Sequence, residues 1–307
     1  MNQIPEPQEP AAPATPAARY CIEHETHYDY AAPVAQSWQL ARLTPRNLAW
    51  QKVLSYSLQI DPPVDEQHES PDSFGNTNVH FALHRPHRRL SVRMICSVEV
   101  ESRASVSATH GQTWEQVRDA VLADASHDDL GAARMCEPTR LLPLSSRARE
   151  YAERHLHPGR DWLHGVLALM HAIHADFEFK PGATSVSTSV DEVLAQRSGV
   201  CQDFAHLMLA GLRSLGLPAR YVSGYLLTDP APGQPRLAGV DASHAWVAAY
   251  APGLGWAEFD PTNNQMADQR YITLAWGCDF GDVAPLRGVI LGGGEQQMEV
   301  RVSVVPV

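Results

Sequence analysis

The stretch RSGVCQDFAHLMLAGLRSLGLPARYVSGYL, residues 197–226, places a cysteine at the start of a helical pattern. From Gln202 onwards, apolar residues recur at spacings of three and four, as on the buried face of an amphipathic helix. Gly216 and Pro218 then follow the last apolar residue, in the order that commonly ends a helix. The pattern predicts a helix over residues 202–215, with Cys201 in its first turn or at its edge.

This position has chemical consequences for the thiol of Cys201. The first turn of a helix has unpaired N–H groups and the positive end of the helix dipole, and both favour an anion. Thiolate is the nucleophilic form of cysteine, so the helix start favours a reactive thiol. Gly199 has no side chain, and we expect it to leave room for a substrate. Taken alone, Cys201 is better interpreted as a buried structural cysteine, so the catalytic interpretation depends on a base and a carboxylate elsewhere in the chain.

A base and a carboxylate are predicted from a β-hairpin further along the chain. The alternating runs SHAWVAAY (243–250) and WAEFDPTNN (256–264) flank the turn sequence APGLG, which is typical of a hairpin. With the turn at residues 251–255, Tyr250 pairs with Trp256. His244 and Asp260 then lie on one face as diagonal neighbours, about 7–8 Å apart. A tighter loop would place them directly opposite each other, and in either arrangement their side chains can touch.

Cys201, His244 and Asp260 are therefore the candidate catalytic residues. The cysteine would be the nucleophile, the histidine the general base, and the aspartate the group that orients the imidazole. This chemistry is attack on an amide-type carbonyl to form a thioester. The backbone N–H of Cys201 is a natural oxyanion donor, and the sequence identifies no second donor.

The remainder of the chain divides by its patterning. Residues 1–18 form a Pro/Ala-rich extension that we expect to be disordered. Residues 19–103 alternate with period two, as in VLSYSLQI (53–60) and LSVRMICSVEV (90–100), which predicts an N-terminal β domain. Residues 104–149 are a weakly patterned linking region. Residues 150–307 are predicted to be the catalytic core, with helices over 163–177 and 190–196 and a final strand in MEVRVSVVPV.

Composition excludes several kinds of partner. The 307-residue chain has a formal net charge of −11, which disfavours nucleic acid and anionic membranes. We interpret a local basic cluster as a solvated strand end: Arg85, His87, Arg88 and Arg89. The five cysteines form no CxxC pair, and the first residues lack a signal-peptide pattern. Both features predict a cytoplasmic protein.

Histidines and tryptophans allow further interpretations. A cluster of histidines could hold a metal, although no HExxH motif or defensible ligand spacing accompanies it: His155, His157, His164, His171 and His174. We therefore predict no metal and no cofactor, with a zinc hydrolase as an alternative. Asp203 is interpreted as a helix cap and His206 as structural. Three tryptophans could line a substrate cleft or belong to the core: Trp246, Trp256 and Trp276.

Several motifs together resemble one family. GVCQDFAHLMLAGLRSLGLPARYVSGYL, SHAWV and GWAEFDPTNN are similar to the core of the bacterial transglutaminase-like superfamily. HETHYDYAAPVAQSWQLARLTPR and DSFGN resemble the β domain that precedes this core, and YITLAWGCDFGDVAPLRGV also fits the family. The resemblance implies an α+β fold, in which an N-terminal antiparallel β domain precedes a papain-like core with a catalytic helix packed on an antiparallel sheet. It assigns nucleophile, base and orienting residue to Cys201, His244 and Asp260.

The resemblance leaves the acyl acceptor open. Members of the family are described as transglutaminases, cysteine proteases or amidases. We expect a peptide or protein substrate, with water as acceptor in a protease or amidase and an amine as acceptor in a transglutaminase. A non-catalytic binding module on the same fold is the alternative function, and the retention of all three residues argues against it.

Overall fold

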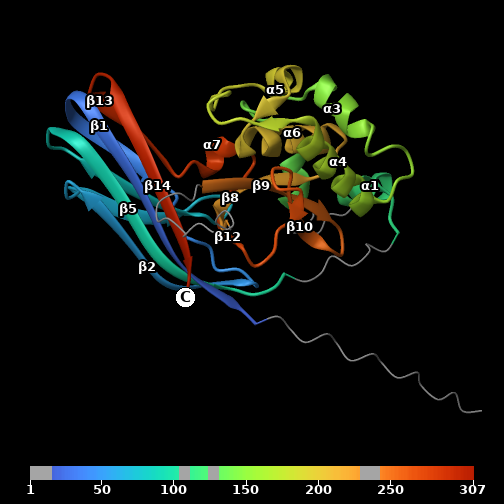
Figure 1. Ribbon diagram of the computed structural model, residues 1–307, viewed down its shortest axis with the longest axis horizontal. Helices are drawn as coiled ribbons and strands as arrows, with labels where there is room; N and C mark the ends of the chain where they lie inside the picture. The colour runs from blue at the N-terminus through green and yellow to red at the C-terminus, as the bar shows by residue number, and fades with distance from the viewer. Residues whose placement is uncertain (1–15, 104–110, 124–130, 229–242) are drawn as a thin grey trace, which may run out of the picture.

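The computed structural model describes residues 16–103, 111–123, 131–228 and 243–307. Most of the predicted disordered extension, residues 1–15, lies outside these ranges. The chain has the predicted α+β architecture, with an N-terminal antiparallel sheet followed by a helix-covered second sheet (Figure 1). Among the described residues, no helix has the length and apolar character needed to cross a bilayer.

Strand β1 (Ala18–Ala41) is the central strand of the N-terminal sheet. Its first half pairs with β5 (His87–Val100) and its second half with β4 (Thr77–Leu83), while β2 (Gln51–Asp61) and β3 (Glu66–Pro71) extend the sheet outward. The alternation predicted for β5 is confirmed, because every second residue from Leu90 to Val100 is buried. In β2 a register shift between Val53 and Ser55 interrupts the predicted face, and Leu54 is exposed.

The end of the chain returns to this same sheet. Strands β13 (Leu286–Gly292) and β14 (Gln296–Pro306) both pair with β1, antiparallel to it. The sequence-based boundaries placed residues 150–307 in the core, so the assignment of these last strands to the core is corrected here. The alternation of MEVRVSVVPV predicts a strand, but it cannot identify the strand's partner, which lies more than 250 residues earlier.

The linking region contributes helices to the core. It contains α1 (Trp114–Ala123), a short 3₁₀ helix η1 (Arg134–Cys136) and the start of α3 (Ser146–Glu153). Trp114 and Val117 of α1 are buried in the main hydrophobic core. The linking region therefore contributes buried residues to the main hydrophobic core.

The core places its helices over a five-stranded sheet. The helices are α4 (Trp162–Asp176), α5 (Val190–Gln196) and α6 (Cys201–Ser214), close to the predicted ranges. The sheet has the order β11 (Gln265–Met266), β10 (Gly255–Asp260), β9 (Ser243–Ala251), β8 (Ala219–Leu226) and β12 (Tyr271–Gly277). Helix α6 packs on β8 and β9, and residues 203–213 of it are all buried. The short pair β6 (Glu178–Phe179) and β7 (Ser198–Gly199) and helix α7 (Phe280–Val283) complete the core.

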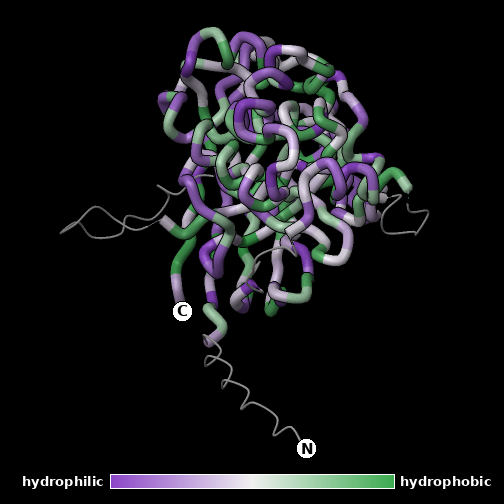
Figure 2. Tube along the Cα trace, turned by 90° about the vertical axis from the view of Figure 1, so that its right-hand side faces the viewer, coloured by the Kyte–Doolittle hydropathy of each residue, from purple (hydrophilic) through white to green (hydrophobic). Residues whose placement is uncertain are grey.

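The DSFGN turn between β3 and β4 joins the two sheets. Asn76 Nδ2 donates to the backbone oxygen of Trp276 at 2.8 Å, and the Trp276 N–H donates back to Asn76 Oδ1 at 3.0 Å. Trp276 Nε1 also donates to the backbone oxygen of Phe74. One hydrophobic cluster runs through both sheets and the helices, and polar and apolar residues are interleaved along the trace (Figure 2). The two sheets are thus held together by both polar and apolar contacts.

Candidate active site

Cys201 is the first residue of α6, as the sequence predicted to within one residue. The N-terminal turn of this helix is capped by Asp203, whose Oδ2 accepts hydrogen bonds from the Val200 N–H at 2.7 Å and from Thr184 Oγ1 at 2.6 Å. The capping role expected for Asp203 is confirmed. Burial raises the pKa of this carboxyl, although both hydrogen bonds act in the opposite direction.

Gly199 makes space for this cap. A Cβ atom at Gly199 would lie 2.7 Å from Asp203 Oδ2 and 2.8 Å from Asp203 Cβ, closer than real contacts allow. We expected the missing side chain to leave room for a substrate, whereas the structure gives that room to Asp203. The glycine therefore serves the local geometry that places Cys201 at the helix start.

The hairpin has the predicted register. Tyr250 pairs with Trp256, and the ladder continues to Val247 and Phe259. His244 at the start of β9 and Asp260 at the end of β10 lie on the same face, and His244 Nε2 donates to Asp260 Oδ2 at 2.7 Å. The structure confirms the predicted contact between the imidazole and the carboxylate.

Asp260 is completely buried and fully hydrogen-bonded. Its Oδ2 also accepts from Tyr271 OH and from Asn263 Nδ2, both at 2.7 Å. Its Oδ1 accepts from the backbone N–H groups of Thr262 at 2.8 Å and Asn263 at 3.2 Å. Burial alone would raise the pKa of Asp260, but the imidazole and the other donors outweigh it and lower the pKa. The carboxylate is therefore held in its charged form.

His244 lies between this carboxylate and the thiol. Its side chain is only 10% exposed. Burial would lower the pKa of His244, but hydrogen bonds to Asp260 and to Cys201, with the charges of both groups, raise it to about 10. Because Nε2 faces Asp260, Nδ1 is the ring nitrogen left for the sulfur. The ring is an imidazolium at neutral pH and has a proton to donate.

Aromatic neighbours fix the plane of the imidazole. Trp246 stacks beside it with ring centroids 6.1 Å apart, and Tyr271 lies at 6.2 Å. The Trp246 indole is itself anchored, since its Nε1 donates to Glu258 Oε2 at 2.8 Å, and Glu258 forms an ion pair with Arg103 at 3.1 Å. Trp246 is fully buried, so it belongs to the core rather than to an open cleft.

Sequence reasoning missed Tyr271 and Asn263. The contact of Asn263 could have been predicted locally, because the turn-forming residues PTNN follow Asp260 and bring Asn263 back towards it. Tyr271 had none, because it lies on β12, which is separated from β10 by two other strands of the sheet. Tyr271 OH is held by Gln265 Nε2 at 2.6 Å, which directs its own hydrogen towards Asp260.

Two histidines of α4 contact the turn that follows Asp260. His174 Nδ1 donates to the backbone oxygen of Thr262 at 2.9 Å, and His171 contacts Asn264 Oδ1. Within the described residues, no group of three or more histidine, cysteine or acidic side chains is arranged to hold a metal ion. His206 is buried and accepts a hydrogen bond from the Phe280 N–H, in keeping with the structural role expected for it.

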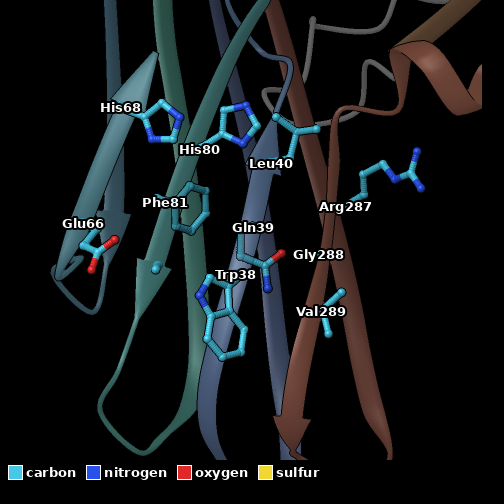
Figure 3. A pocket seen from close by; sticks show the side chains of 11 residues that line it. Trp38, Gln39, Leu40, Glu66, His68, His80, Phe81, Arg287, Gly288 and Val289 are labelled. Carbon is cyan, nitrogen blue, oxygen red and sulfur yellow. The ribbon is translucent and has the colours of Figure 1, made fainter. Parts of the chain in front are cut away.

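A separate hollow of about 460 Å³ lies on the N-terminal sheet (Figure 3). It is bordered by strands β1, β3, β4 and β13. The stacked rings of His68 and His80, 4.7 Å apart, lie at one end, and Trp38 lies towards the other. None of its lining residues belongs to α6, β9 or β10, and none is a cysteine. This hollow is therefore distinct from the candidate active site.

Comparison with known proteins identifies the family of this chain. The family description "Transglutaminase-like superfamily" matches residues 149–261, and "Bacterial transglutaminase-like N-terminal region" matches residues 20–99. An uncharacterised protein of Mycobacterium tuberculosis is 39% identical over 302 residues, covering 96% of this chain and 95% of the relative. A protein-glutamine gamma-glutamyltransferase of Pseudomonas aeruginosa is 38% identical over 95 residues, which are 31% of this chain and 14% of that protein.

A solved structure shares the fold over nearly the whole chain. The crystal structure of a candidate cysteine protease from Cytophaga hutchinsonii has a TM-score of 0.77, covers 95% of this chain and 92% of that chain, and is 22% identical in sequence. At this identity the likeness bears on the fold. Together with the family matches, it shows that the chain belongs to the transglutaminase-like superfamily and has the bacterial transglutaminase-like N-terminal region before its core.

Proposed function

We propose that the protein performs cysteine-dependent acyl chemistry on a peptide or carboxamide, with Cys201 as nucleophile, His244 as acid and base, and Asp260 as the orienting carboxylate. The observation that carries this proposal is the buried 2.7 Å contact between His244 and Asp260 beside a cysteine at a helix start. The family as a whole supports cysteine-based catalysis.

The reaction has two halves. In the first, the Cys201 sulfur attacks the carbonyl carbon, and the developing oxyanion accepts a hydrogen bond from the Cys201 N–H. The imidazolium gives its proton to the leaving nitrogen, the C–N bond breaks, and a thioester remains. In the second half, neutral His244 takes a proton from the acceptor, which attacks the thioester and releases the thiolate. Asp260 stays ionised throughout and stabilises the imidazolium each time it forms.

The acceptor decides between two named activities. With water the product is a carboxylic acid, as in a protease or amidase. With a primary amine the product is a new amide, as in a transglutaminase. The relative from Pseudomonas aeruginosa supports the second, although the likeness covers only 31% of this chain. A non-catalytic binding module is the rival proposal.

Mass spectrometry of the intact protein tests the proposal. After incubation with glutamine-containing peptides, we expect an acyl adduct on Cys201 that hydroxylamine removes, as a thioester requires. The same peptides with and without a primary amine then show whether an acid or an amide is released. Cys201→Ala is the inactive control and Cys278→Ala the matched control for a cysteine outside the site. Absence of an adduct and of product with every peptide favours the binding module.

A cytoplasmic location is proposed from the cysteines. All five are free in the structure, as expected in a reducing compartment. Fractionation of cells that express the full chain tests this prediction, and recovery from an exported fraction would contradict it.

A further inference from the structure

A cavity of about 470 Å³ lies at the far end of the core sheet from Cys201. One wall is the DSFGN turn of the N-terminal sheet, through Ser73 and Phe74. A second wall comes from residues 131–139 of the linking region. The third is the core sheet itself, through Arg220, Trp256 and Trp276. Three segments that are distant in sequence therefore enclose a volume suited to a small molecule.

Arg220 on β8 is the buried charged group in this cavity. Its exposed fraction is 7%, and its Nε has no hydrogen-bond partner. Within the described ranges, no carboxylate forms an ion pair with it. The nearby Glu258 acts on Arg220 through its charge. Its Oε2 binds Arg103 and Trp246, and its buried Oε1 has no hydrogen-bond partner. Four other arginines also have buried guanidinium nitrogens without partners, but only Arg220 among the five lines this cavity: Arg42, Arg46, Arg103 and Arg213.

Stacking stabilises the cation of Arg220 without satisfying its donors. The guanidinium carbon lies 3.6 Å from the ring centre of Trp276 and 4.2 Å from that of Trp256. Strand order puts these indoles on the two sides of Arg220, because β12 neighbours β8 on one side and β10 lies beyond β9 on the other. Indoles cover the faces of a guanidinium, whereas its N–H groups point outward in its own plane. The N–H groups at the edge of the Arg220 guanidinium can therefore donate hydrogen bonds to a ligand in the cavity.

The cavity is separate from the candidate active site. Arg220 pairs with Ala248, four residues from His244 on β9, which corresponds to about 13 Å along the strand. Val222 and Trp246 fill the sheet face between the two places, and both are completely buried. A ligand bound at Arg220 would therefore not contact the thiol.

We propose that this cavity binds a small carboxylate, with the edge of the Arg220 guanidinium holding the anion and the two indoles lying against its apolar part. A planar guanidinium matches a carboxylate with two parallel hydrogen bonds. The lining favours a single negative charge, because the two cations Arg220 and Arg134 are accompanied by Glu137. Met135 and Phe74 add apolar surface for a short hydrocarbon chain.

The cation is present at neutral pH. Burial lowers the pKa of Arg220 to about 9; the charge of Glu258 partly offsets this, the charge of Arg46 adds to it, and the group remains protonated near pH 7.

Calorimetric titration of the full chain carrying Cys201→Ala tests the proposal, since this background cannot turn over a ligand. Butyrate is the probe, butyramide its neutral counterpart, and inorganic phosphate the competing anion, all at constant ionic strength. We expect saturable binding of butyrate. Butyramide should bind more weakly by roughly tenfold or more, because it loses the charge-assisted pair. Phosphate should also bind more weakly, because it has no apolar part to lie against the indoles and carries more negative charge than the lining favours. Equal binding of butyrate and butyramide, preference for phosphate, or no saturable binding would overturn the proposal.

Variants locate the binding at Arg220. Arg220→Met should weaken butyrate binding roughly tenfold or more, and Arg220→Lys, which keeps the charge without the planar edge, should fall between. Arg46→Met is the matched control, because Arg46 lies 3.6 Å from the same indole but binds Asn76 and does not line the cavity. Equal losses in Arg46→Met and Arg220→Met would overturn the assignment. If Arg220→Met does not fold, Arg220→Lys and the comparison of butyrate with butyramide test whether the anion binds to the Arg220 guanidinium.

Discussion

The two ends of the core sheet each contain a buried charged group, and the two groups differ in how they are hydrogen-bonded. At one end, Asp260 accepts five hydrogen bonds from described residues, and its only charged neighbour is His244. At the other end, Arg220 is also buried, but its Nε has no hydrogen-bond partner. A charged side chain whose hydrogen bonds are all made within the protein is held in one position, whereas one with unused donors can bind a ligand. The comparison predicts chemistry with a preset geometry at the first end and reversible binding at the second.

The largest expected effect is the loss of His244. His244→Ala should lower turnover about 10²–10⁴-fold, because the imidazole's contribution is proton transfer. The strand accepts alanine, so circular dichroism should show an intact fold. His68→Ala, on the N-terminal sheet, is the control and should leave turnover unchanged. Full activity in folded His244→Ala protein would remove the histidine from the mechanism.

Thiol reactivity should separate Cys201 from the buried cysteines. Burial raises the pKa of Cys96 to about 12 and that of Cys136 to about 11, and it also raises the pKa of Cys278. Limiting iodoacetamide near pH 7 should therefore label Cys201 first, by roughly tenfold or more over these three. Peptide mapping by mass spectrometry gives the order of labelling. Preferential labelling of Cys136 or Cys278 would contradict the assignment.

Asp260→Asn should have a smaller effect on turnover than His244→Ala or Cys201→Ala. An amide can still accept from one ring nitrogen, but the imidazolium loses its counter-charge, so alkylation of Cys201 should shift to higher pH. The amide's NH₂ group must also face donors that one carboxylate oxygen accepted, which costs about 1–3 kcal/mol of stability.

Asp279→Asn is the matched control for this substitution. Asp279 is also buried and accepts a hydrogen bond from the Gly281 N–H, but it lies away from His244. It should lower stability without moving the alkylation profile of Cys201. An unchanged profile in Asp260→Asn would show that the carboxylate does not act through the imidazole.

The last expected effect is a change of stability with pH. The pKa of His244 is about 10 in the folded chain and about 6.5 when unfolded, so its protonation stabilises the fold fully below pH 6.5. This contribution should decline as the pH rises towards 10. Urea unfolding should show that the wild type has a higher free energy of unfolding than His244→Gln at pH 6.5. This difference should become smaller as the pH rises to 10. A constant difference would mean that the imidazole is not protonated in the folded chain.

The parts of the site that sequence could predict are those set by local patterning. Strand alternation and turn length gave the register of β9 and β10, and with it the contact of His244 with Asp260. The role of Gly199 was misjudged, because a missing side chain does not say which neighbour uses the space. Tyr271 and Arg220 escaped notice for another reason, since their roles depend on strands that come together only in the folded sheet.

The pairing of β13 and β14 with β1 has a consequence for how the chain is made. During synthesis, β1 emerges first, whereas its two remaining partners emerge only after the entire core. Until then one edge of β1 stays open along both halves, and an open strand edge is a template for joining another chain. Ribosome-bound chains that stop before residue 286 should therefore be the most aggregation-prone intermediates, and completion of the last strand is the step that closes the molecule.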